Sequence, residues 1–270
     1  MIYKTIQPSQ HLQHIVKDYS LLHFKCDSIQ IKPFPANTRH CLVFYLKGTV
    51  NCYDFKESKF QTFPKISING TQISRYNFHL DNEFLMLSVN FNPTGLSKFL
   101  RMPITEFTDK RINANDLLDN DISQIYERLV NIISYDEMIS ILEKYLWNRI
   151  KRINIEIKPI DRVTNVLSIS TDTLSIKKLA SHSCLSVSQF ERLFYKINGV
   201  TPKFYYRINR FNNAYQMKEL NPKTDWLSIA IQFGYYDYQH LVSDFKTFSL
   251  TVPNSLIQQQ ALSPERVLNL

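Results

Sequence analysis

Residues 185–202 read LSVSQFERLFYKINGVTP, and this stretch decides how the C-terminal half of the chain is interpreted. Its apolar residues recur at spacings of three and four, which places them on one face of a helix: Phe190, Leu193, Phe194 and Ile197. Ser186 precedes the first turn and can accept hydrogen bonds from its free amides. Gly199 and Pro202 are typical of a helix end followed by the start of another helix. The sequence therefore predicts a helix over residues 187–198.

A second copy of this design lies 51 residues downstream. The equivalent positions are Phe190 and Leu241, Phe194 and Phe245, Ile197 and Phe248, and Pro202 and Pro253. Upstream of each copy stands an aliphatic residue followed by alanine, Leu179-Ala180 and Ile229-Ala230, at an offset of 50. A small residue at this place lets two helices cross closely. The pattern predicts two successive helix-turn-helix units.

A long helix is predicted between the two units, over residues 202–220. One face of it carries Phe204, Ile208, Phe211 and Tyr215. At 1.5 Å per residue, such a helix measures roughly 28 Å. Recognition helices that enter successive major grooves on one side of DNA lie about 34 Å apart. A connecting helix of this length, together with its turns, can hold them at that separation without a dimer.

Positive charge is concentrated in the same region. The whole chain has a formal net charge of +8, which is compatible with a polyanionic partner. Between Ser188 and Lys218 there are six basic residues and one acidic residue. A charge run of this kind is also common on an ordinary solvated surface, so it supports a nucleic-acid partner only together with the helix pattern.

The N-terminal part of the chain has a strand pattern. Segments rich in β-branched and aromatic residues cover residues 42–46, 49–55, 66–69 and 84–91, separated by turn residues. Helical periodicity follows in three places, at Leu96 to Leu100, at Ile122 to Ile133 and at Ile139 to Ile150, and residues 151–159 read as a linker. The predicted fold class is α+β, with a small antiparallel barrel or sandwich and trailing helices before an all-α C-terminal domain.

Residues 160–258 resemble the DNA-binding domain of the AraC/XylS family of bacterial transcription regulators. The resemblance rests on LA-SHSCLSVSQFERLF, NGVTP, Arg210 with Ala214 in the connecting helix, and IAIQFGYYDYQHLVSDFK, in this order. It implies a seven-helix domain with two helix-turn-helix units joined by a long helix. Two positions depart from the family pattern, because Cys184 and Leu250 stand where the family has glycine. A left-handed backbone conformation costs a non-glycine residue roughly 1 kcal/mol or more.

The resemblance also implies site residues. The first recognition helix would contact bases through Ser188, Glu191 and Arg192, and the second through Gln239, His240 and Ser243. Phosphate contacts are expected from Gln189, Lys196, Arg207 and Lys246. Arginine is suited to guanine O6 and N7, and glutamine to adenine N6 and N7.

The first 150 residues more weakly resemble the cupin-like N-terminal domain of some of these regulators, through VNFNPTGL at residues 89–96 and the helices that follow. The expected domains are therefore 1–152, regulatory or dimerising, and 159–260, DNA-binding. Aromatic residues of the strands either line an effector pocket or fill a barrel core: Phe44, Tyr45, Tyr53, Phe55, Phe84 and Phe91. The expected partners are double-stranded DNA, RNA polymerase, an unidentified small-molecule effector and a second copy of the chain.

Enzymatic motifs do not emerge from the sequence. The four cysteines form no CxxC pair, the histidines of the first domain have no metal-ligand spacing, and no nucleophile elbow or phosphate-binding glycine loop occurs. We expect no catalytic residue, metal or cofactor. With no apolar run of membrane length and no signal-peptide pattern, we expect a cytoplasmic protein and no membrane partner. The alternatives are a cupin-type metal enzyme with an accessory helical domain, and a protein–protein adaptor.

Overall fold

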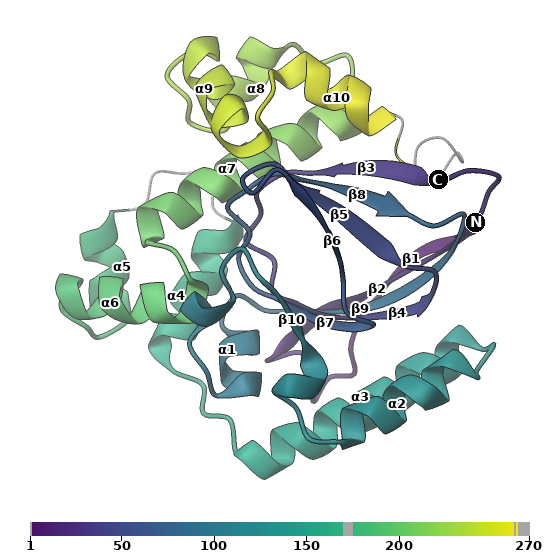
Figure 1. The fold of residues 1–270 in the computed structure, drawn as a ribbon. Helices are drawn as coiled ribbons and strands as arrows, with labels where there is room; N and C mark the ends of the chain where they lie inside the picture. Colours follow the sequence, from purple (N-terminus) through teal and green to yellow (C-terminus); the bar gives the residue numbers. More distant parts are fainter. Residues whose placement is uncertain (1, 170–174, 262, 264–270) are drawn as a thin grey trace.

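Two antiparallel sheets form the N-terminal part of the computed structural model, which describes residues 2–169, 175–261 and 263 (Figure 1). The six-stranded sheet has the order β1 (Ile2–Ile6), β2 (Val16–Lys25), β9 (Glu83–Phe91), β4 (Cys41–Lys47), β7 (Ile66–Asn69) and β10 (Arg111–Asn113). The four-stranded sheet has the order β3 (Gln30–Phe34), β8 (Tyr76–Leu80), β5 (Val50–Asp54) and β6 (Lys59–Thr62).

Side chains of both sheets meet in one apolar cluster. In β5, Val50 and Cys52 are buried while Asn51 and Tyr53 are less so, which is the alternation of a strand with one inward face. The opposite sheet contributes Leu22 and Phe84 to the same cluster. The four predicted strand segments are confirmed as β4, β5, β7 and β9.

Helices cover the other face of the six-stranded sheet. They are α1 (Gly95–Leu100), η1 (Ile104–Phe107), η2 (Ala114–Asp116), α2 (Asp121–Val130) and α3 (Tyr135–Ile153). Figure 1 shows α2 and α3 side by side beneath this sheet, and Leu129 and Leu142 are fully buried in the cluster that they form with it. The prediction that the second helix reaches Ile133 is wrong, because α2 ends at Val130 and Ser134 caps α3, leaving Ile133 exposed.

The C-terminal part consists of helices α4 (Pro159–Ile169), α5 (Ile176–His182), α6 (Val187–Asn198), α7 (Pro202–Leu220), α8 (Trp226–Gln232), α9 (Tyr238–Ser249) and α10 (Pro253–Ala261). The predicted recognition helix and connecting helix are confirmed with their expected bounds. One apolar cluster joins α4, α5 and α6 to the first half of α7, and another joins α8, α9 and α10 to its second half.

The predicted caps of α6 are confirmed, and the two positions that depart from glycine lie next to α6 and α9. Ser186 caps α6, accepting from the Gln189 amide at 3.2 Å, and Gly199 ends it with φ 75°. At the positions that depart from glycine, Cys184 and Leu250 still adopt the left-handed region, with φ 56° and 53°. Both residues therefore hold a conformation that glycine adopts more readily, with a backbone strain of about 1 kcal/mol each.

None of the helices in the described parts of the chain is long and apolar enough to cross a membrane.

Candidate nucleic-acid interface

Helix α6 presents its predicted base-contacting residues on the outer surface. Ser188, Glu191 and Arg192 are exposed, whereas Phe190 and Phe194 on the opposite face are fully buried. The buried pair packs with a ring-centroid distance of 5.7 Å and anchors the helix against α7 through Tyr205. The burial of one face therefore fixes which side chains α6 offers to a partner.

Two predicted phosphate contacts also lie on α6. Lys196 is exposed near the C-terminal end of the helix. Gln189 is exposed, but its side-chain oxygen accepts a hydrogen bond from the Ser186 backbone amide at 3.0 Å. This bond completes a capping box, so Gln189 stabilises the helix start as well as facing outward.

Helix α9 repeats the arrangement. Asp237 caps it, accepting from the His240 amide at 2.7 Å. Gln239, His240 and Ser243 are exposed, while Leu241 and Phe245 are fully buried against α7 and α8. Lys246 is exposed on the following turn.

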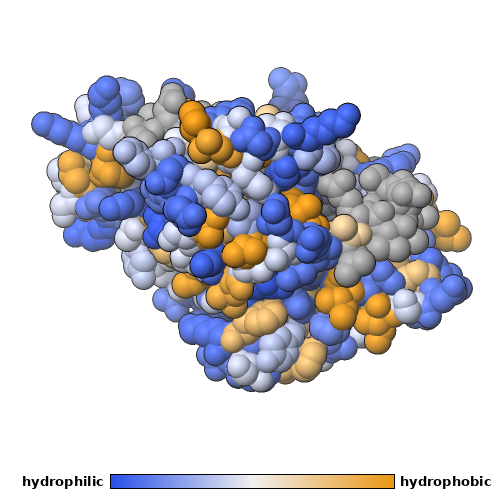
Figure 2. Space-filling model, turned by 90° about the horizontal axis from the view of Figure 1, so that it is seen from above, coloured by the Kyte–Doolittle hydropathy of each residue, from blue (hydrophilic) through white to orange (hydrophobic). Residues whose placement is uncertain are grey.

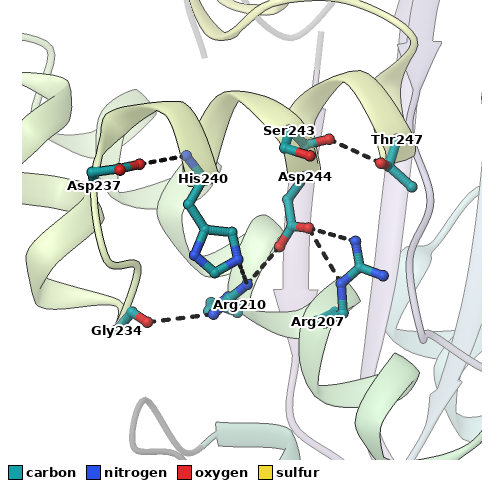
Figure 3. A network of polar contacts seen from close by, with 8 residues as sticks. All are labelled: Arg207, Arg210, Gly234, Asp237, His240, Ser243, Asp244 and Thr247. Carbon is teal, nitrogen blue, oxygen red and sulfur yellow. Dashed lines mark hydrogen bonds and ion pairs between the residues drawn. The ribbon is translucent and has the colours of Figure 1, made fainter.

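A buried carboxylate joins α9 to the connecting helix. Asp244 is 1% exposed and accepts from Arg207 Nη2 at 2.7 Å and from Arg210 Nη2 at 2.8 Å (Figure 3). Both arginines project from α7, and a charge buried this deeply is tolerated only because it is paired and hydrogen-bonded. The network therefore fixes the crossing of α7 and α9.

The same network reaches the predicted base contact His240. Arg210 Nη2 lies 3.4 Å from His240 Nε2, and the guanidinium stands over the Tyr235 ring at 3.9 Å. His240 meets that ring edge-on at 5.3 Å. Burial lowers the pKa of Arg210, but the hydrogen bonds to Asp244 and Tyr235 and the charges of these two groups together outweigh this effect, so the pKa stands above its ordinary value. Arg210 thus carries a permanent positive charge beside the exposed imidazole.

Arg207 is both ion-paired and partly exposed. Its guanidinium binds Asp244, and its side chain remains 34% exposed. Its expected phosphate contact stays a prediction, with the exposed part of the guanidinium as the group that would make it.

Comparison with solved structures places this arrangement among known folds. An apo form of a ToxT variant from Vibrio cholerae, with alanine in place of one lysine, matches with a TM-score of 0.51 and 12% identity, over 90% of this chain and 97% of that chain. The chain has the fold of this ToxT structure. At this identity the likeness concerns the fold, which confirms the predicted α+β class and the predicted resemblance.

Two further solved structures are similar to this chain. Wild-type ToxT from Vibrio cholerae, bound to an unsaturated fatty acid, matches with a TM-score of 0.48 and 13% identity, over 91% of this chain and 96% of that chain. A regulator from Chromobacterium violaceum with an AraC-type DNA-binding domain matches with a TM-score of 0.35 and 23% identity, over 38% of this chain and 92% of that chain. Residues 4–113 match a family described as a domain of unknown function (DUF6597). No curated protein matches the chain.

Two features of this candidate interface are not predicted from the sequence. Asp244 lies next to a predicted contact, but only the crossing of α7 and α9 reveals that it is buried between arginines. Tyr236 is 91% exposed immediately before the cap of α9, and its aromatic character in a turn was the available signal. The face of the molecule over α8, α9 and α10 is mainly hydrophilic, with isolated hydrophobic side chains (Figure 2).

A cavity of about 140 Å³ lies between the two sheets of the N-terminal part. Of the aromatic residues proposed for a pocket, Tyr45 and Phe84 line it. Phe44 and Phe91 instead belong to the cluster on the other face of the six-stranded sheet. Three basic side chains line the cavity together with apolar residues: Lys32, Arg39 and Arg111.

Metal-ligating side chains are scattered in the described residues, where no group of three or more histidine, cysteine, aspartate or glutamate residues is placed to hold an ion.

Proposed function

We propose that the chain is a sequence-specific DNA-binding transcription regulator that reads two successive major grooves. The observation that carries the proposal is the pair of equivalent recognition helices, α6 and α9, which both expose their predicted base-reading side chains and are joined by the 19-residue α7. A helix of this length spans about 28 Å, which with its turns matches the spacing of about 34 Å between successive grooves.

In this proposal the site residues divide by role. Ser188, Glu191 and Arg192 read bases in one groove, with Arg192 on guanine. The second groove is read by Gln239, His240 and Ser243, with Gln239 on adenine. Phosphates are contacted by Gln189, Lys196, Arg207 and Lys246. These side chains are exposed on α6 and α9, and that of Arg207 is partly exposed on α7, which supports the assignments.

We further infer that residues 1–152 form the regulatory domain and residues 159–260 the DNA-binding domain. The cavity between the sheets, at about 140 Å³, has room for a ligand of about the size of benzene, and its basic residues would favour a ligand that carries a negative charge. We infer that the partners of the protein, besides DNA, are a second copy of the chain and RNA polymerase. The protein would act in the cytoplasm.

Selection of binding sites from random DNA, with and without a mixture of cell metabolites, tests the proposal. We expect one enriched site with two conserved segments, and an affinity that falls steeply with salt concentration. An adaptor that uses the helices only for protein contacts would enrich no sequence. A cupin-type enzyme would instead retain stoichiometric metal after purification, which metal analysis would detect.

A further inference from the structure

Both recognition helices end on the N-terminal β-domain, at equivalent positions of the repeat. Thr71 Oγ1 donates to the carbonyl oxygen of Asn198, the last residue of α6, at 2.6 Å. Arg75 Nη1 donates to the carbonyl oxygen of Ser249, the last residue of α9, at 2.7 Å. Asn198 and Ser249 are separated by the repeat offset of 51 residues. Residues 71–75, here called the clamp segment, therefore contact the same point of both helix-turn-helix units.

The contacts at these helix ends satisfy backbone groups that a helix leaves without partners. The last carbonyls of a helix need donors from outside it. At α9, the amide of Ala36 donates to the Phe248 carbonyl at 3.0 Å, next to the Arg75 contact. At α6, Thr108 Oγ1 donates to the Gly199 carbonyl at 3.2 Å. The β-domain thus caps both helices, including the strained end at Leu250.

The middle of the clamp segment packs against both units at once. Ile73 contacts the apolar cluster of the first unit and also that of the second. Phe204 of α7 also packs against both clusters. A single side chain from the β-domain therefore stands between the two units, beside the helix that joins them.

The clamp segment is itself held firmly. Asp109 accepts from the amides of Ile73 and Ser74 at 2.7 and 3.0 Å, and from Ser74 Oγ at 2.6 Å. The Gln72 side chain donates to the Phe34 carbonyl at 2.9 Å. Because these hydrogen bonds hold the clamp segment to the rest of the β-domain, its position is set by that domain and in turn restrains the two helix-turn-helix units.

The base-reading faces stay free in this arrangement. Arg192 and Gln239 are exposed although the opposite ends of their helices are docked. Docking at the helix ends therefore orients the helices and does not cover them.

We propose that Thr71 and Arg75 are positioning residues that set the separation and orientation of the two recognition helices, and so the spacing of the DNA segments that the protein accepts. This proposal rests on the DNA-binding function proposed above. It assigns to the β-domain a part in DNA recognition although no residue of that domain is required to touch DNA.

The clamp segment also borders the cavity between the sheets. Arg111 donates to the side-chain oxygen of Gln72, and both residues line the cavity. A negatively charged ligand that draws the Arg111 guanidinium toward itself would weaken this hydrogen bond at the centre of the clamp segment. The cavity and the recognition helices are therefore joined by a continuous set of contacts, which is the physical requirement for coupling between two sites.

The first test needs no DNA. Spin labels on unnatural amino acids at positions 196 and 246 of the full-length chain, both exposed, report the distance between α6 and α9 while the four native cysteines remain. We expect one narrow distance distribution in the otherwise unchanged chain and a broader or shifted one in Thr71→Val and in Arg75→Gln. Thr71→Ser and Arg75→Lys keep a donor at about the same reach, whereas the amide of glutamine ends closer to the backbone, so these two variants are expected to restore the narrow distribution. An unchanged distribution in both Thr71→Val and Arg75→Gln would overturn the proposal.

The second test uses DNA whose two contacted segments lie at the selected spacing or are separated by one or two inserted base pairs. Because each variant removes one hydrogen bond of the clamp, we expect the preference for the selected spacing to fall about tenfold in Thr71→Val and in Arg75→Gln. The matched control Arg192→Ala is expected to lower base preference while keeping the spacing preference. Equal spacing preference in clamp variants and unchanged protein would contradict the positioning role.

Failure of the two proposals can be told apart. If the unchanged protein selects no DNA sequence, the DNA-binding function is wrong, and the label distances still decide whether the clamp segment holds the helices. Thr71→Val and Arg75→Gln each alter one of the two contacts to the helix ends. If circular dichroism shows that one variant does not fold, the other variant still gives the result.

Discussion

Asp244 on α9 accepts a hydrogen bond from Arg210 on α7 at 2.8 Å, and both side chains are almost fully buried. This pair lies beneath the exposed His240, so it links the crossing of two helices to the predicted second recognition surface. Removing the carboxylate leaves Arg210 as an uncompensated buried charge, which is the costly way to break such a pair.

Asp244→Asn is therefore expected to lower the free energy of unfolding by about 3 kcal/mol or more, since two arginines lose their carboxylate. Urea unfolding followed by circular dichroism measures the change. The matched control is Arg207→Ala, which removes a partly exposed partner and is expected to cost about 1 kcal/mol or less. Equal losses for the two variants would show that the buried arginine does not depend on this carboxylate.

Arg192→Ala is expected to reduce specific DNA affinity by about 1–3 kcal/mol and to relax base preference at one position. Lys196→Ala, on the same helix, removes a predicted phosphate contact and is expected to weaken binding equally on all sequences, with a smaller salt slope. Binding measured on the selected site and on each single-base change separates the two outcomes. If Arg192→Ala weakens every sequence alike, Arg192 contacts the backbone.

His40 predicts a specific pH dependence of stability. Burial lowers its pKa to about 4, and its Nε2 lies 3.0 Å from Thr71 Oγ1. The unfolded chain takes up a proton near pH 6.5, whereas the folded chain does so only near pH 4, so stability is lost as the pH falls through this window. The loss is about 3 kcal/mol between neutral pH and pH 4.

His40→Gln keeps a hydrogen-bonding side chain but has no titration in this range. The difference in unfolding free energy between the unchanged chain and this variant should therefore change with pH between about 6.5 and 4. A difference that stays constant across this window would show that His40 does not titrate differently in the folded and unfolded states.

Leu250→Gly is expected to stabilise the chain by about 0.5–1 kcal/mol, because glycine adopts the left-handed conformation without strain. The greater conformational entropy of glycine in the unfolded chain offsets part of this stabilisation. Cys184→Gly is expected to act in the same direction. The control is Gly199→Ala, where a side chain would meet both a positive φ and Thr108 of the β-domain. The thermal unfolding temperature should rise in the first two variants and fall in the third. A lower unfolding temperature in Leu250→Gly would mean that the leucine side chain stabilises the helix end.

The sequence predicts the helical half of the molecule closely because its elements are set by local signals. Ser186, Gly199 and Pro202 mark helix ends within a few residues of the apolar stripe, so α6 and α7 have their predicted bounds. The exposed faces of α6 and α9 follow from the same stripes. These features depend on the period of the helix and require no knowledge of distant partners.

Strand pairing and buried polar contacts are predicted less well because they depend on residues far apart in the chain. β1, β2, β3, β6, β8 and β10 were not among the predicted strands. β2 is stabilised by pairing with β9, for example Tyr19 opposite Val89. Its sequence mixes polar and apolar residues, so the strand cannot be predicted from its own pattern. Thr71 and Arg75 likewise gain their roles only when the β-domain meets two helix ends.

Footprinting of the full-length protein on its selected site tests the central claim most directly. The account predicts two protected segments on one face of the DNA, about one helical turn apart, with Arg192→Ala weakening protection of one segment and Gln239→Ala that of the other. A single protected segment that responds to Arg192→Ala alone would contradict the claim that α6 and α9 read successive grooves.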